Sequence, residues 1–276
     1  MATKTQLGTL WNTPDELWDL IAPILGPEKA PGTVGRPACP FRVIFDATVY
    51  VLRTGCQWHA LPRQVYAPGS TVHARFSQWV EAGVFYQAWQ TVLGYYDQEV
   101  GIDWKWQALD GAITKAPLGG QATGPSPVDR GKQGTKRSVL TDRRGAPLSI
   151  VVTAANAHDK TVALETLDGI VVERPEKAVY RLHHLCLDKG YDYNDVIAGV
   201  QERDYILHGR KRGELPYTSA TGKKHPARRW VVERTHAWHN RFRRLLVRWE
   251  KKSSNYEAML QIASIFIIFR LTVLST

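Results

Sequence analysis

Two kinds of hydrophobic pattern divide the chain near residue 100, and this division constrains the fold more than any other feature. Before it, apolar residues recur at helical spacing, as in Phe41, Ile44, Phe45 and Leu52, which predicts short helices. We expect these over about 14–25, 41–53, 70–81 and 84–97. After it, short apolar runs typical of strands alternate with helical stretches. The sequence therefore predicts a helical domain, residues 1–100, and an α/β domain, residues 101–276.

The α/β part has an element order that selects one architecture. We expect strands over about 104–110, 136–141, 147–153, 183–188 and 205–208. We expect helices over about 160–171, 193–202, 227–249 and 254–273. Three strands, a helix, a strand, a helix, a strand and two helices is the order of the RNase H-like fold, with helices on both faces of a mixed five-stranded sheet. The Gly- and Pro-rich segment 115–135 is expected to be a surface loop.

The helical domain has the size and helix count of a helix-turn-helix-like reader of DNA. Helix count alone does not separate this role from dimerisation or packing, so both alternatives stay open. The apolar stretch 262–274 is too short for a membrane span, which needs about 20 residues. We therefore expect a buried terminal helix and no membrane partner.

The positive charge is concentrated in one window. The chain carries a formal net charge of +10, and residues 201–252 hold fifteen Lys and Arg against five Asp and Glu, which equals that surplus. Basic side chains gain free energy by displacing counterions from phosphates. A nucleic acid is therefore the expected partner, and a solvated basic face without a partner is the alternative.

Two aspartates follow apolar strands and suggest a catalytic site. Asp110 ends the expected strand 104–110, and Asp188 ends the expected strand 183–188. These strands are neighbours in such a sheet, so the two carboxylates converge, and Glu233 lies on the helix that packs against that edge. Carboxylate oxygens suit Mg²⁺, and two such ions about 4 Å apart can activate an attacking oxygen and stabilise a leaving one. Three acids among 26 Asp and Glu are a weak signal without this context.

Basic and polar residues surround these acids in the sequence. At 3.6 residues per turn, one side of the Glu233 helix carries Arg229, His236, Asn240 and Arg244, with Arg241 flanking it. We expect these five residues to contact DNA; the alternative is an ordinary basic amphipathic helix. A second basic cluster around the expected hairpin includes Lys136 and Arg137, which we also expect to contact DNA. Its other members are Lys132, Arg143 and Arg144.

Other candidates have structural explanations. Asp159 is expected to cap a helix, and His158, His183 and His184 are expected to pack in the core or at a sheet edge. The chain contains no phosphate-binding loop of the GxGxxG or GxxxxGK[ST] type, so no nucleotide is expected. Three cysteines without a CxxC pair and the lack of an apolar leader predict a cytoplasmic, nucleoid-associated protein.

Four segments carry a resemblance to a known family. They are DGAITKAPLGG from Asp110, ANAHD over 155–159, LCLDKGYD ending at Asp192, and RWVVERTHAWHNRFRRL around Glu233. In these segments the chain resembles bacterial insertion-sequence transposases of the IS-five family, which is related to the IS-four family. Arg229 and Glu233 match a Tyr–Arg–Glu–Lys signature of those families, and Pro226 and Asn240 stand at its tyrosine and lysine positions.

The resemblance implies an activity. Asp110, Asp188 and Glu233 would be the catalytic carboxylates, working with Mg²⁺, and Mn²⁺ would also support activity. The protein would bind the terminal inverted repeats of an insertion sequence, cut the element ends and join the 3′-hydroxyl to double-stranded target DNA, as a homodimer on paired ends. The alternatives are a nuclease or resolvase without strand transfer, and a catalytically silent DNA-binding regulator.

Overall fold

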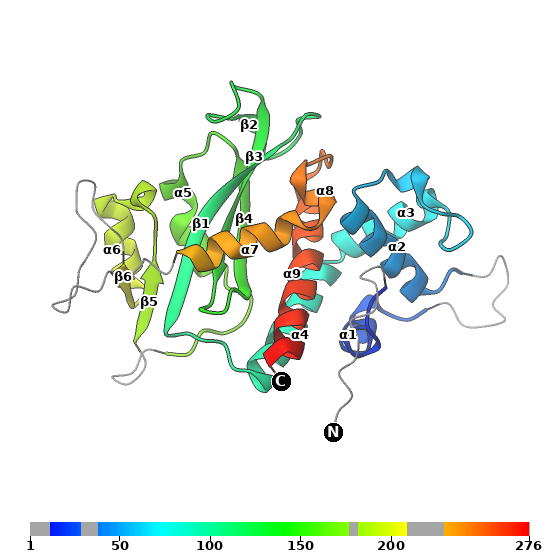
Figure 1. The fold of residues 1–276 in the computed structure, drawn as a ribbon, viewed down its shortest axis with the longest axis horizontal. Helices are drawn as coiled ribbons and strands as arrows, with labels where there is room; N and C mark the ends of the chain where they lie inside the picture. The colour runs from blue at the N-terminus through cyan, green and yellow to red at the C-terminus, as the bar shows by residue number, and fades with distance from the viewer. Residues whose placement is uncertain (1–11, 29–37, 177–181, 209–228, 276) are drawn as a thin grey trace.

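The helical part has the expected elements. The computed structural model describes residues 12–28, 38–176, 182–208 and 229–275 (Figure 1). Its first helices are α1 (Asp15–Ile21), α2 (Phe41–Thr54), α3 (Gly69–Glu81) and α4 (Val84–Glu99), with short 3-10 turns at Ala22–Leu25 and Trp58–Ala60. Gly55 and Gly83 adopt φ angles of 73° and 68°, which glycine reaches without strain, and they mark the end of α2 and the start of α4. The four predicted helices are confirmed to within a few residues.

The α/β part contains a mixed sheet. Its strands are β1 (Trp106–Lys115), β2 (Gly124–Pro125), β3 (Gln133–Thr141), β4 (Pro147–Ala154), β5 (His183–Cys186) and β6 (Tyr205–His208). β3 pairs antiparallel with β1, β2 and β4, whereas β5 pairs parallel with β1 and β6. The connected order β4–β3–β1–β5–β6 confirms the expected RNase H-like sheet.

The sheet is larger than expected at one end. β1 continues to Lys115, and β2 adds a sixth strand inside the segment expected to be loop. Gly124 of β2 pairs with Gly134 of β3. A Cβ on Gly124 would lie 2.1 Å from Asn156 Oδ1, so a larger residue there would require the Asn156 side chain to move. The Gly and Pro content of this segment predicted a loop, but the same residue types also occur in a two-residue strand such as β2.

Helices cover both faces of this sheet. The helix α5 (Asp159–Asp168) packs on β3 and β4, α7 (Trp230–Asn240) crosses β1 and β3 in front of the sheet, and α6 (Asn194–Glu202) packs beside β6 (Figure 1). Lys136 contacts the first residue of α5, whereas its neighbour Arg137 contacts α7. Successive strand residues point to opposite faces, so these two helices lie on opposite sides of the sheet.

The long helix expected over 227–249 is interrupted. Within the described residues it begins at Trp230 as α7 and ends at Asn240, and Phe242 is extended before the short α8 (Arg243–Leu246). Val247 then forms a parallel bridge with Lys115, and the Arg248 amide donates to the Lys115 carbonyl at 2.8 Å. The expectation was wrong because pairing with the end of β1 overrides the local helical preference.

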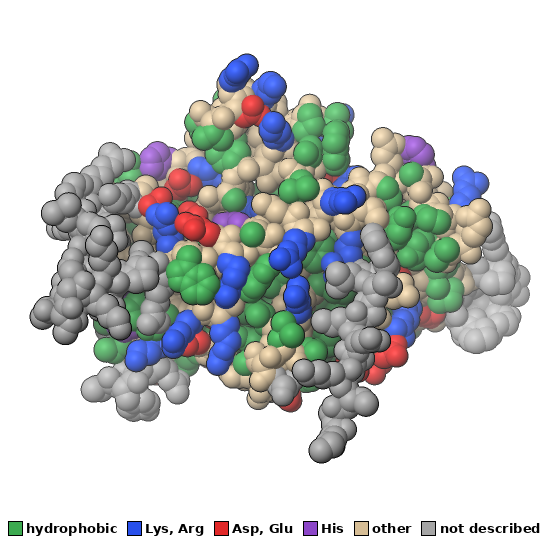
Figure 2. Space-filling view, viewed as in Figure 1, with side chains coloured by type: hydrophobic (Ala, Val, Ile, Leu, Met, Phe, Trp, Pro, Cys, Tyr) green, Lys and Arg blue, Asp and Glu red, His purple; other side chains and the backbone are tan. Residues whose placement is uncertain are grey.

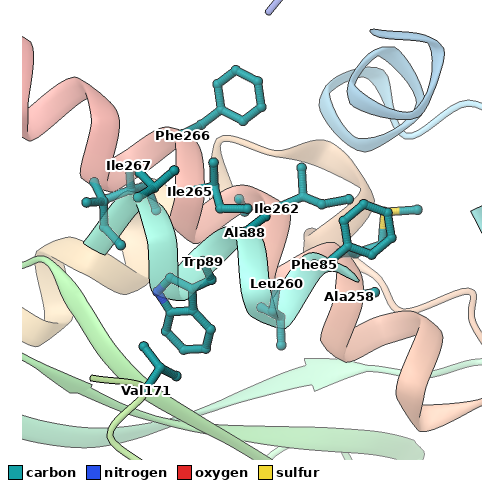
Figure 3. Close-up of a cluster of buried hydrophobic side chains, with 14 of the residues drawn as sticks. Phe85, Ala88, Trp89, Val171, Ala258, Leu260, Ile262, Ile265, Phe266 and Ile267 are labelled. Atoms are coloured by element: carbon teal, nitrogen blue, oxygen red, sulfur yellow. The ribbon is translucent and has the colours of Figure 1, made fainter. Parts of the chain in front are cut away.

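The terminal helix α9 (Ser253–Ser275) is the core of the molecule. By length and mean hydropathy, 1.9 over its most apolar window, it resembles a membrane span, but 61% of that window is buried inside the protein. It lies beside α4, with apolar side chains such as Ile262, Ile265 and Phe85 packed between the two helices (Figure 3). Trp89 of α4 donates from Nε1 to the Pro147 carbonyl of β4 at 3.2 Å. The expected buried terminal helix is confirmed.

The helical part and the sheet therefore share one hydrophobic cluster. Leu17 of α1, Phe45 of α2 and Leu185 of β5 belong to the same buried set. The proposed division at residue 100 falls between α4 and β1, and it stays a prediction. A helix that is apolar on all sides needs partners on all sides, and α4, β4 and α8 supply them.

We expect Ile262→Ala to lower the free energy of unfolding by about 2–5 kcal/mol, because its fully buried side chain leaves a cavity between α4 and α9. Leu274→Ala on the same helix, where 64% of the residue is exposed, is the matched control and should change it by less than about 0.5 kcal/mol. Urea unfolding measures both. Equal effects of the two substitutions would contradict a core role for α9.

Candidate active site

The register between β1 and β5 brings Asp110 and Asp188 to the same level of the sheet. The last pair of this parallel ladder is Ala108 with Cys186, and each aspartate lies two residues further along. Equal spacing places both on the same face, because side chains alternate. Asp110 lies in the middle of β1 and Asp188 follows β5, so neither ends its strand as expected. Their convergence rests on register instead.

The helix α7 places Glu233 beside these aspartates. Val232 packs in a small buried cluster with Ala108 and Cys186, which fixes α7 over the end of the parallel ladder. Arg229, immediately before the helix, donates to the Asp188 carboxylate and to Glu233 Oε1, the latter at 3.1 Å. One guanidinium therefore joins two of the three expected carboxylates. Figure 2 shows acidic side chains gathered beside basic ones near the start of α7.

Asp110 is half-buried, and its surroundings change its pKa more than those of a surface carboxylate. Burial is the largest cause that raises its pKa, to about 6; the Gly111 amide and Arg229 lower it, and the charges of Asp188 and Glu233 raise it again. The Gly111 amide donates to Asp110 Oδ1 at 2.9 Å. The three acids thus act on one another electrostatically, which isolated surface carboxylates do not.

Asp159 is a further carboxylate close to Asp110, on the α5 face of the sheet, and sequence reasoning assigned it to a helix cap. The cap of α5 is His158, whose Nδ1 accepts from the Lys160 amide at 3.3 Å. Asp159 Oδ1 instead pairs with Lys136 Nζ at 2.8 Å, and a Cβ on Gly111 would lie 2.8 Å from the same oxygen. Asp159 therefore lies against the backbone next to Asp110. The ANAHD segment was the available signal, but a cap and a site residue look alike in sequence.

The hydroxyl of Tyr191 lies among the same acids. Burial raises the pKa of this phenol far above its ordinary value, and the charges of Asp159, Asp110 and Asp188 raise it further. Tyr191 is 2% exposed and is the last residue of the 3-10 turn that follows Asp188. Tyr191 was not among the site residues predicted from the sequence.

Four of the expected DNA contacts are buried and have partners within the chain. Lys136 pairs with Asp159, as described above, and Arg137 donates from Nη2 to Asn240 Oδ1 at 2.6 Å. Burial lowers the pKa of His236 to about 3, so this histidine is neutral. Arg244 donates from Nε to Glu250 Oε1 at 2.7 Å. In the described structure Lys136, Arg137, His236 and Arg244 are buried and paired and do not face a ligand, so direct DNA contact at these four residues stays a prediction.

The remaining expected contacts are accessible. Arg241 and Asn240 are exposed, and Arg229 is half-buried at the acids. In the hairpin cluster, Lys132, Arg143 and Arg144 are exposed, and Arg143 lies 3.5 Å from Asp103. Basic side chains also mark the tip of the sheet at β2 (Figure 2). His183 is buried and His184 stacks on Trp106 at a centroid distance of 4.3 Å.

The donor chemistry of the site fits a hard divalent cation. Its candidate ligands are carboxylate oxygens, and a bound cation would offset both the burial of Asp110 and the charges of Asp188 and Glu233, which raise the pKa of Asp110. As the side chains stand, no group of three His, Cys, Asp or Glu in the described part of the chain is close enough to hold one ion. Arg229 joins Asp188 to Glu233 instead. An ion bound here would compete with Arg229 for these carboxylates.

Two family models match the chain. One, described as "Transposase DDE domain", matches residues 107–268. The other, described as "Putative transposase of IS4/5 family", matches residues 14–93. The first match contains Asp110, Asp188, Glu233 and Asp159, and the second spans α1 to α4.

Individual relatives agree with these matches. The chain is 35% identical over 147 residues to "Putative transposase for insertion sequence element IS402" of Burkholderia cepacia, which covers 52% of this chain and 67% of that protein. It is 33% identical over 119 residues to "Insertion element IS402 uncharacterized 16.2 kDa protein" of the same organism, covering 41% and 79%. Among solved structures, "Crystal structure of a pre-cleavage Mos1 transpososome" shares 8% identity, covers 89% of this chain and 82% of that chain, and has a TM-score of 0.30. A TM-score of 0.30 is too low to establish a shared fold.

We expect Asp110→Asn to stabilise the metal-free protein at pH 8 by about 1–3 kcal/mol. The folded pKa of about 6 exceeds the reference value of 3.8, so folding favours protonated Asp110, and the ionised form costs stability above pH 6. Below pH 3.8 the cost vanishes, so the gain should be small at pH 4. Urea unfolding in chelator at both pH values measures it.

Asp168→Asn provides the control of opposite sign, because hydrogen bonds from Arg203 lower the pKa of Asp168. That substitution should not stabilise the protein at pH 8. If Asp110→Asn leaves stability unchanged or reduces it at pH 8, the electrostatic description of the site is wrong.

Proposed function

The chain belongs to the DDE transposase family, and from this premise we propose that Asp110, Asp188 and Glu233 are its catalytic carboxylates. The observation that carries the proposal is the convergence of these acids from β1, the end of β5 and the start of α7, with Arg229 joining Asp188 to Glu233 and the charges of both raising the pKa of Asp110. All three lie within the region that matches the family.

Family membership indicates a divalent metal, and we propose Mg²⁺, with Mn²⁺ also supporting activity. When bound, such ions supply an activated attacking oxygen and stabilise the leaving oxygen of a phosphodiester. Asp110 and Asp188 would hold the ions between β1 and β5, and Glu233 would complete the ligand set from α7. Arg229, released from the acids, would be free to hold a phosphate, because its planar guanidinium suits that anion.

The partners proposed are the terminal inverted repeats of an insertion sequence and a double-stranded target. The positive surplus of residues 201–252 supports a DNA partner. The chain would cut the element ends and join the freed 3′-hydroxyl to target DNA. Joining two ends requires two active sites near one another, so a homodimer on paired ends is proposed. The helix-turn-helix-like role of residues 1–100 and a cytoplasmic, nucleoid-associated location are part of the same proposal.

The decisive experiment uses the DNA that flanks the reading frame. Labelled fragments carrying both flanks are incubated with the full chain, Mg²⁺ and a supercoiled target plasmid. A transposase gives cut ends and joined product, whereas a nuclease or resolvase gives cut ends alone. A silent regulator binds the fragments without cutting them. Cut ends without joined product, or binding without cutting, would overturn the proposal.

We expect Asp110→Ala, Asp188→Ala and Glu233→Ala each to abolish cutting and joining, because each removes an oxygen ligand. The affinity for the DNA ends, measured by gel shift in chelator, should stay within about threefold of the unmodified protein, because acids do not attract phosphates. Asp168→Asn, an acid paired with Arg203 outside the site, is the matched control and should cut normally. Normal cutting by Asp110→Ala would refute the assignment.

Arg241 is the exposed candidate for phosphate contact. It follows α7 eight residues after Glu233, about 12 Å at 1.5 Å per residue. We expect Arg241→Ala to weaken DNA binding and to reduce the slope of log K against log salt by about 1, the loss of one phosphate contact. Arg203→Ala, which removes an arginine occupied by Asp168, should leave the slope unchanged. An unchanged slope for Arg241→Ala would exclude this contact.

A further inference from the structure

Two adjacent basic residues of β3 hold the Asp110 segment from opposite faces of the sheet. Lys136 is 6% exposed and Arg137 is 1% exposed. β3 pairs antiparallel with β1, so Arg137 lies opposite Ala112 and Val139 lies opposite Asp110. Lys136 reaches Asp159 on the α5 face, whereas Arg137 reaches His236 and Asn240 on the α7 face. The sequence predicted DNA contact for Lys136 and Arg137. Because both side chains are buried, another role has to explain them.

The contacts of Arg137 fix the tautomer of His236. Arg137 Nε lies 3.4 Å from His236 Nδ1, and Arg137 Nη2 lies 2.6 Å from Asn240 Oδ1. A guanidinium has only donors, so Nδ1 must accept and the imidazole proton must lie on Nε2. Nε2 faces the main-chain carbonyl of Asp110 at 3.3 Å. His236 therefore donates to the carbonyl of the residue whose carboxylate carries the proposed chemistry.

We propose that His236 is a positioning residue for Asp110. His236 lies three residues after Glu233 on α7. Its hydrogen bond to the Asp110 carbonyl ties this helix to the backbone of β1. Arg137 orients the imidazole, and Asn240 holds Arg137 one turn further along. The spacing between the Asp110 and Glu233 carboxylates is thereby set by hydrogen bonds through the buried side chains of Arg137 and His236. This inference rests on the proposed function, because it assigns a role toward the same carboxylates.

Ligand groups need this kind of support. A carboxylate set holds an ion well only when its members stay within a narrow range of positions, and hydrogen-bonding neighbours that hold them typically change metal affinity or activity by about 10–100-fold. Asp188 and Glu233 are both accessible and are joined through Arg229. The helix that carries Glu233 is held to the Asp110 backbone by the buried side chain of His236.

The test compares His236→Leu with His236→Gln in the full chain. Leucine fills the space without a donor, whereas glutamine can place its amide nitrogen near the position of Nε2. Mn²⁺ binding to the DNA-free protein is measured by electron paramagnetic resonance, and kcat and KM are measured for end cutting. We expect His236→Leu to weaken Mn²⁺ binding by about 10-fold or more and to lower kcat, with KM for DNA within about twofold. His236→Gln should recover most of both losses.

His239→Leu is the matched control. It is a fully buried histidine on the same helix, and its Nε2 contacts Ser264 Oγ of α9 at 3.1 Å rather than β1. It should lower thermal stability and leave Mn²⁺ affinity unchanged. If His236→Leu does not fold, Asn240→Leu replaces it, because Asn240 is exposed and its loss only frees Arg137; it should weaken Mn²⁺ binding in the same direction.

Three results would overturn the proposal. They are unchanged Mn²⁺ affinity in His236→Leu or in its substitute Asn240→Leu, equal losses in the Leu and Gln variants of His236, and an equal loss in His239→Leu. Failure of the proposed function looks different: Asp110→Ala itself would then bind Mn²⁺ and cut DNA like the unmodified protein. The two failures are therefore distinguishable in one series of variants.

Discussion

The buried guanidinium of Arg137 is the interaction on which the geometry of the site depends. A charged group with 1% exposure is stable only where hydrogen bonds replace its water. The partners described for Arg137 all belong to α7, namely His236 and Asn240. A shift of α7 by one residue would leave a buried charge without these acceptors, which costs more than the loss of an ordinary contact. The register of the helix that carries Glu233 is therefore fixed by charge burial, and the apolar cluster around Val232 only supports it.

Several basic side chains are buried, so the net charge of the sequence overstates the positive charge at the surface. Lys136, Arg137, Arg244 and Arg248 all contribute to the net charge of +10, yet each is buried. Arg248 donates to the carbonyls of Gln121 and Ala122 and so holds the segment that leads into β2. The surface that meets a polyanion therefore carries less positive charge than the composition suggests. Accessible residues such as Arg241, and not the total, decide how strongly DNA is attracted.

The sequence was sufficient for the architecture and for the neighbouring positions of Asp110 and Asp188. Strands such as Tyr205–His208 show an apolar pattern that depends only on local spacing, and neighbouring strands bring Asp110 and Asp188 together by topology alone. Burial of basic residues was not predictable, because strand alternation shows that Lys136 and Arg137 face opposite sides but not that helices cover both. The end of α7 at Asn240 depends on pairing between Val247 and Lys115, a contact between distant segments. Asp159 was predicted to cap α5, but the cap is His158, one residue earlier. Local sequence pattern does not resolve a helix start to one residue.

The packing of α9 against α4 also has a consequence for the order of events during synthesis. α4 emerges from the ribosome long before α9, and until then its apolar face lacks the helix that covers it. Contacts between segments so distant in sequence form late and leave apolar surface open to aggregation in the meantime. Until α9 is made, the nascent chain therefore exposes an apolar face of α4 that the finished protein covers. A chain truncated before α9 would be incompletely folded as well as shorter.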